Sequence, residues 1–213
     1  MTPTPGGPTP FRVALTFDVE HHDRPATADA TETLLGLLTD LELRTTCFIQ
    51  GRWAEAYPGT AGSIAAAGHL VGNHSYYHAR MPLFTDAGLA EDLAESGRVI
   101  RETTGADPRP WFRCPFGVGA DDPRVQAAVR SAGYRHVGWN VGVEDWDPAN
   151  SAATIEREVI ERTLAHGDGA VVLLHSWPTA TRGAIGAIAG RLRDAGATFV
   201  TIDALGEVPS TVT

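Results

Sequence analysis

Short apolar runs alternate with stretches of helical apolar spacing along almost the whole chain. Residues 11–17 have the pattern of a buried strand, and residues 27–43 that of an amphipathic helix. Strands that alternate with helices form βα units and a parallel sheet. About seven such units in 213 residues favour a small, incomplete barrel over a full eightfold one. The other expected strands are 45–49, 69–71, 111–113, 135–141, 170–174 and 198–201. The other expected helices are 53–67, interrupted at Pro58–Gly59, and 85–104, 122–132, 151–166 and 181–195.

The composition favours a single domain with a sizeable buried core. Apolar residues make up 43% of the chain, and no change in composition marks a linker. We therefore expect one domain over residues 11–207. A flexible Pro/Gly/Thr-rich tail is expected at residues 1–10, and a short C-terminal tail at residues 208–213.

Charge and hydropathy argue against several classes of partner. The formal net charge is -9 and no basic run occurs, which argues against nucleic acid and anionic membrane surfaces. No segment is long and apolar enough to span a bilayer, and the N-terminus lacks the pattern of a signal peptide. This predicts a cytoplasmic protein if the N-terminus is native, and an extracellular one if the sequence is trimmed from an exported enzyme. The oligomeric state is left open.

The two cysteines do not suggest a disulfide framework. Cys47 lies in an apolar run and is expected to be a small core residue. Cys114 follows Arg113, which leaves a reactive thiol open as an alternative, although no base stands at a recognisable spacing.

Polar side chains stand close after the ends of the expected strands. The carboxyl ends of parallel strands share one rim, and active sites of α/β folds are built there. The chain therefore brings acids, bases and possible metal ligands to one edge of the barrel. The residues in these positions are Asp18, Glu20, His74, Arg113, Asp145 and His175.

His74 and His78 form an HxxxH pair after the third expected strand. On a single helical turn both imidazoles would lie on one face and could bind one divalent metal. Alone, such a pair is more often a capping histidine and a half-buried one. Asp18 and Glu20 favour the metal site, because residues two apart in an extended segment point the same way. One carboxylate can complete the site, and the other can act as a base.

Two histidines and one carboxylate are typical of a catalytic zinc site with open coordination positions. Non-haem iron enzymes use the same set, so the set alone does not decide the metal. Beside a metal and a base, His175 is the expected general acid, although a strand-end histidine often has no such role. Arg113 is well placed to hold a carboxylate in position.

These residues resemble the polysaccharide deacetylases of the NodB-homology type, carbohydrate esterase family 4. The resemblance implies an α/β fold, a distorted and incomplete (β/α)7 barrel. It also implies an enzyme that removes acetyl groups from N-acetylated sugars or acetylated xylan with a divalent metal, usually Zn²⁺, with Co²⁺ or Ni²⁺ as alternatives. The motifs of the family occur in order at Thr16–Glu20, His74–His78, Arg113–Phe116, Trp139–Trp146 and Leu173–His175.

The resemblance also implies a role for each site residue. The implied roles are Asp18 as base, His175 as acid, Arg113 and Asp145 as the residues that orient them, His74 and His78 as metal ligands, Pro115, Trp146 and Leu173 as lining of the acetyl pocket, and Phe116 as an oxyanion donor through its backbone N–H.

The chain departs from the family pattern at three places. The family commonly has adjacent aspartates in the first motif, but Val19 follows Asp18 here, so we assign the metal to Glu20. Gly142 stands where the fourth motif often has an aspartate, which predicts different hydrogen bonding around the arginine. The pair His21–His22 replaces small residues; it is expected either to be a solvated loop or to reshape the substrate entrance.

The expected function is hydrolysis of an acetamide on a sugar polymer or oligosaccharide. Two alternatives remain at this point. One is a related amidohydrolase that acts on a small metabolite or cyclic amide, which the missing export signal favours. The other is a non-catalytic carbohydrate-binding barrel with exposed tryptophans as platforms, against which the complete set of base, ligands and acid counts.

Overall fold

The computed structural model describes residues 9–21, 27 and 29–212. The strands are β1 (Phe11–Val19), β2 (Thr46–Ile49), β3 (Leu70–Asn73), β4 (Trp111–Phe112), β5 (Arg135–His136), β6 (Val141–Gly142), β7 (Ala170–His175) and β8 (Ala197–Phe199). The helices are α1 (Ala30–Asp40), α2 (Gly51–Ala56), α3 (Pro58–Ala66), α4 (Asp86–Thr104), α5 (Pro123–Ser131), α6 (Ala152–His166) and α7 (Thr179–Asp194). Single turns of 3-10 helix are η1 (Met81–Leu83), η2 (Pro115–Gly117) and η3 (Ile202–Ala204).

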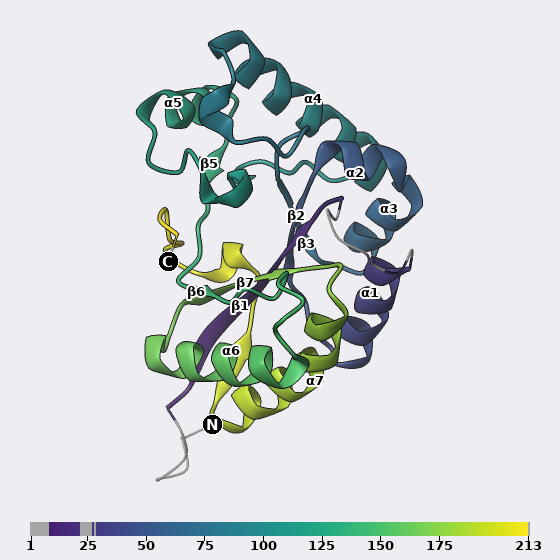
Figure 1. The fold of residues 1–213 in the computed structure, drawn as a ribbon, viewed down its shortest axis with the longest axis vertical. Helices are drawn as coiled ribbons and strands as arrows, with labels where there is room; N and C mark the ends of the chain where they lie inside the picture. Colours follow the sequence, from purple (N-terminus) through teal and green to yellow (C-terminus); the bar gives the residue numbers. More distant parts are fainter. Residues whose placement is uncertain (1–8, 22–26, 28, 213) are drawn as a thin grey trace.

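The strands form one curled parallel sheet that does not close. Its order is β5-β4-β3-β2-β1-β7-β6, and β8 pairs with the beginning of β1 outside this path. Figure 1 shows the strands in the middle of the molecule, with α1 to α4 along one side and α6 and α7 across the lower end. Among the described residues no pairing joins β5 to β6. The predicted incomplete (β/α)7 barrel is therefore confirmed.

Strand β1 is central, and its alternation decides which side chains reach the rim. The odd-numbered residues from Val13 to Val19 pack in the large cluster between the sheet and the helices. Ala14 packs in the smaller cluster on the other face, inside the barrel. Side chains alternate along a strand, so Thr16 and Asp18 share that inner face. Glu20 continues the same series and reaches the inner rim just beyond the strand.

Helix α4 is delimited by the signals that its sequence predicts. The Thr85 hydroxyl accepts a hydrogen bond from the Gly88 N–H at 3.1 Å and caps the first turn. Gly105 ends the helix with φ 72°, a left-handed conformation that glycine adopts at little cost. Leu89 and Leu93 pack against β4 and α5 in a second apolar cluster, which fixes the helix beside the third and fourth strands.

The helical segment expected over residues 53–67, with an interruption at Pro58–Gly59, consists of two helices, α2 and α3. Pro58 begins α3, and Tyr57 before it has φ -128° and ψ 57°, outside the helical region. Proline lacks an N–H and disfavours the helical conformation of the residue before it, so the chain bends there.

The strand expected over residues 135–141 is broken into β5 and β6. Between them the chain pairs with the C-terminal segment: Gly138 N–H donates to Pro209 O at 2.7 Å, and Trp139 N–H donates to Thr211 O at 3.2 Å. A Cβ on Gly138 would lie 1.8 Å from Thr211 O, so this close approach requires glycine. Figure 1 shows the C-terminus near β6.

The two expected tails differ in what the structure describes. Residues 208–212, expected as a C-terminal tail, lie along the connection between β5 and β6. Most of the N-terminal tail, residues 1–8, lies outside the described residues. Within the described part of the chain, no helix has the length and apolar character needed to cross a membrane.

Candidate metal centre and active site

His74 and His78 lie close together, but on a loop and not on a helical turn as the sequence predicts. His74 directly follows β3, and Asn73 Oδ1 accepts a hydrogen bond from the Ser75 N–H at 2.9 Å. Such an Asx turn competes with helix formation. Ser75 and His78 have φ values of 67° and 56°, which excludes a right-handed helix. The imidazole centroids are nevertheless 4.9 Å apart.

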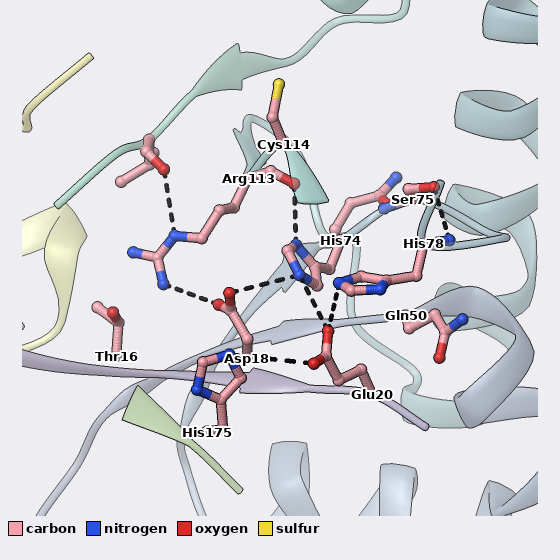
Figure 2. A network of polar contacts seen from close by, with 12 residues as sticks. Thr16, Asp18, Glu20, Gln50, His74, Ser75, His78, Arg113, Cys114 and His175 are labelled. Atoms are coloured by element: carbon pink, nitrogen blue, oxygen red, sulfur yellow. Dashed lines mark hydrogen bonds and ion pairs between the residues drawn. The ribbon is translucent and has the colours of Figure 1, made fainter. Parts of the chain in front are cut away.

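Both carboxylates of the first motif reach this histidine pair. Oδ2 of Asp18 and Oε2 of Glu20 each lie 3.4 Å from His74 Nε2. Glu20 Oε2 also lies 2.5 Å from His78 Nε2. Figure 2 shows the side chains of β1 and of the loop after β3 converging on one point.

The hydrogen bonding of His74 leaves Nε2 available to a cation. Its Nδ1 lies 2.9 Å from the carbonyl oxygen of Arg113. A carbonyl can only accept, so Nδ1 carries a proton, and in the neutral imidazole Nε2 has the free lone pair. Metal-binding histidines are commonly fixed in this way by a carbonyl or carboxylate on the other nitrogen.

Glu20, His74 and His78 fit a divalent cation. Their ligand atoms lie within 4.8 Å of one another, and Glu20 and His74 are buried. Oε2 of Glu20 and Nε2 of His74 are buried without a hydrogen-bond partner among the described residues. Burial alone would raise the pKa of Glu20, but the two imidazoles and His175 hold that pKa well below its usual value. One carboxylate and two imidazoles form a donor set that suits zinc.

Asp18 is held by Arg113 on the side away from the histidines. Arg113 is fully buried, and its Nη1 donates to Asp18 Oδ1 at 2.8 Å. Its Nε and Nη2 donate to the carbonyl oxygens of Val137 and Gly138 at 3.2 and 3.1 Å. Carbonyl groups thus satisfy this arginine, whereas Gly142 in β6 offers it no carboxylate. The different hydrogen bonding expected from Gly142 stays a prediction; in this chain Arg113 donates to two backbone carbonyls and to Asp18.

His175 is oriented by Asp145. Its Nδ1 lies 2.7 Å from Asp145 Oδ1, and its backbone N–H donates to Oδ2 at 2.8 Å. The hydroxyl of Thr181, at the start of α7, donates to the same Oδ2 at 2.7 Å. Burial opposes protonation of His175, but the charge and hydrogen bond of Asp145 raise its pKa to about 9. His175 therefore carries a proton at neutral pH, and its Nε2 lies 4.0 Å from Glu20 Oε1.

A cavity of about 380 Å³ opens above these groups. Its size and largely aromatic walls suit a small organic group with a few fixed polar contacts. Pro115, expected in the lining, is buried and is not among the lining residues, whereas Phe116, expected as a backbone donor, is one of them. The lining residues are Asp18, Glu20, His21, His78, Phe116, Trp139, Trp146, Leu173, His175 and Trp177.

The structure adds cavity and support residues that the sequence analysis did not assign. Trp139 lines the cavity because the C-terminal segment pairs with its backbone, and no local pattern indicates this. Thr181 reaches Asp145 from a helix, where a threonine carries no distinctive signal. His21 lines the cavity, whereas His22 lies outside the described residues.

The two thiols take no part in this site. Burial raises the pKa of Cys47 and of Cys114 to about 12, so neither is a thiolate at neutral pH. The reactive thiol left open at Cys114 is therefore not supported.

Comparison with known proteins identifies the family. A model of the polysaccharide deacetylase family matches residues 6–137, more than half of the chain. The chain belongs to the polysaccharide deacetylase family, and the resemblance carried by its motifs is confirmed.

Relatives of known name include enzymes and a pseudoenzyme. The chain is 29% identical over 197 residues to a peptidoglycan-N-acetylglucosamine deacetylase of Bacillus cereus, covering 91% of this chain and 67% of the relative. A family 4 carbohydrate esterase from Streptomyces lividans, solved in complex with acetate, is 30% identical with a TM-score of 0.78, covering 91% of this chain and 93% of that one. A family 4 pseudoenzyme from Bacillus anthracis is 25% identical with a TM-score of 0.81, covering 93% and 66%.

Proposed function

We propose that the chain is a metal-dependent deacetylase that hydrolyses the N-acetyl group of an acetylated sugar in an oligosaccharide or polymer. One observation carries the proposal: a three-ligand cluster lies between a carboxylate held by arginine and a protonated histidine held by aspartate, beneath one cavity. Relatives named as peptidoglycan and chitin deacetylases support the substrate class.

Glu20, His74 and His78 are the proposed ligands, and their nitrogen and oxygen donors suit Zn²⁺. A divalent cation bound there would polarise the acetyl carbonyl and lower the pKa of a bound water.

The remaining groups move the protons. Asp18 takes a proton from the attacking water, and Arg113 keeps this carboxylate ionised and correctly turned. The backbone N–H of Phe116 donates to the developing oxyanion. His175 gives its Nε2 proton to the amide nitrogen as the C–N bond breaks, so that a neutral amine leaves with acetate as the other product.

Trp146 and Leu173 are proposed to enclose the acetyl methyl group. Both line the cavity, and Leu173 precedes the acid in the chain by two residues. An apolar wall around the methyl group leaves the carbonyl oxygen facing the polar groups, which orients the amide for attack.

The test is acetate release by the purified, zinc-loaded protein. Chitooligosaccharides and peptidoglycan fragments are compared with small N-acetyl compounds and cyclic amides. We expect acetate from the sugars, loss of activity with a chelator, and recovery with added zinc. Hydrolysis of cyclic amides alone would establish the small-metabolite alternative, and no hydrolysis of any compound would favour a binding protein.

The metal site has a separate test. His74→Ala removes a ligand, so we expect its zinc content after dialysis to fall well below that of the wild type. Unchanged zinc content would refute the assigned ligands whatever the activity shows.

A further inference from the structure

The loop that carries both histidine ligands is held by a buried carboxylate on helix α4. Asp92 is 2% exposed and accepts three consecutive donors of the loop. Its Oδ1 lies 3.1 Å from the Ser75 hydroxyl and 3.1 Å from the Tyr77 N–H, and its Oδ2 lies 3.1 Å from the Tyr76 N–H. Among the described residues, no cationic side chain forms an ion pair with it. A buried carboxylate without a cation is costly, and neutral donors alone satisfy this one.

The donors lie between two residues of unfavourable backbone conformation. Ser75 and His78 both have positive φ, at 67° and 56°. A positive φ is energetically unfavourable for residues other than glycine. Such a conformation persists only when contacts with the surrounding structure stabilise it. Asp92 binds the peptide N–H groups between these two positions, so it stabilises the turn that brings the imidazoles together.

A hydrogen-bond chain connects Asp92 to the second histidine. The Ser75 hydroxyl donates to Asp92 Oδ1 and accepts from the His78 N–H at 3.2 Å. The first histidine is held from the other side, where Asn73 Oδ1 accepts both the Ser75 N–H and the Ser96 hydroxyl. Helix α4 thus contacts the loop through Asp92 and, by way of Asn73, through Ser96, and the hydrogen bonds from Asp92 continue through the Ser75 hydroxyl to His78.

We propose that Asp92 is a positioning residue that sets the spacing of His74 and His78 and thereby the metal affinity of the site. The inference rests on the proposed metal site. Removal of a group that orients metal ligands commonly lowers metal affinity 10–100-fold, and we expect about this loss on Asp92→Asn. The substitution keeps one acceptor oxygen but turns the other into an amide that faces the Tyr76 N–H.

The experiment is a zinc titration in competition with a chromophoric chelator, for wild type and Asp92→Asn. Glu91→Gln is the matched control, because it removes the same charge from the neighbouring, exposed position of α4. The cobalt-loaded proteins give a second measurement, since the visible spectrum of Co²⁺ reports the arrangement of its ligands. We expect weaker zinc binding and an altered cobalt spectrum only in Asp92→Asn.

The outcomes distinguish a role of Asp92 in positioning the metal ligands from a role in the stability of the fold alone. If Asp92→Asn melts at a lower temperature but binds zinc within twofold of wild type, Asp92 is merely structural and the proposal is overturned. If Asp92→Asn does not fold without metal, Ser75→Ala decides: it removes only the bridge to His78, and unchanged zinc affinity would overturn the proposal. If wild type itself binds no zinc, the proposed metal site fails, a result distinct from an Asp92 effect.

Discussion

The two halves of the site are built in opposite ways. On the acid–base side, each group has fixed partners within the protein: Asp18 accepts from Arg113, and His175 is fixed by Asp145. On the metal side, Oε2 of Glu20 and Nε2 of His74 have no hydrogen-bond partner among the described residues.

The backbone shows the same difference. Asp18 and His175 belong to β1 and β7, which pair with each other in register at these residues. His78 lies in a loop with a left-handed φ. The acid–base groups thus have hydrogen-bond partners within the protein, whereas the metal side has buried acceptors that a cation would satisfy. The predictions below test this division.

The strongest test changes each of the two carboxylates to its amide, one at a time. Both carboxylates lie equally far from His74 Nε2. Asp18→Asn should retain zinc and lose up to about 10⁴-fold in turnover, because it removes the base and no ligand. Glu20→Gln should lose zinc binding, because an amide is a poorer ligand than a carboxylate. Zinc content and acetate release are measured for both variants.

The opposite pattern would reverse the assignment. Zinc loss in Asp18→Asn with full retention in Glu20→Gln would make Asp18 the ligand and Glu20 the base.

His175→Ala should lower turnover by about 10²–10⁴-fold, because the departing nitrogen then receives no proton from a positioned acid. The zinc content and the melting temperature should stay near those of the wild type. Near-normal turnover would show that another group is the acid.

Asp145→Asn should change the pH profile of kcat more than the amount of bound zinc. A general acid acts while protonated, so the wild type should keep its activity until the pH rises through the His175 pKa of about 9. Without the charge of Asp145 that pKa falls toward 6.5, and the alkaline loss of activity should begin at lower pH. An unchanged alkaline limb would remove Asp145 from this role.

The smallest effects concern two glycines in different settings. Gly138→Ala should lower stability by about 1–3 kcal/mol, because its Cβ would collide with Thr211 O on the acid–base side. Gly186→Ala, in the interior of α7 with no atom near its added Cβ, should raise stability by about 0.5–1 kcal/mol. Thermal unfolding compares both with wild type, and equal shifts would show that the C-terminal contact does not matter.

Much of the fold and rim follows from the sequence because strand burial and helix periodicity are local signals. Asp18, Glu20 and His175 were predictable because each lies at or just after the end of an apolar strand. The parallel pairing of β1 with β7 then brings these strand ends together. The conformation of the histidine loop was not, because a four-residue spacing suits either a helical turn or a compact loop. Asp92 and Trp139 act through contacts distant in sequence, which no local pattern encodes.

The position of β1 in the chain affects how the protein is made. Strand β1 is synthesised well before β7 (Ala170–His175), its partner along one edge. At usual synthesis rates, that edge of β1 stays without its partner for roughly 8–30 s. An exposed apolar strand edge invites association with other chains. Soluble yield should therefore depend on translation speed and holding chaperones, which arrested chains ending before residue 170 would test by chaperone binding.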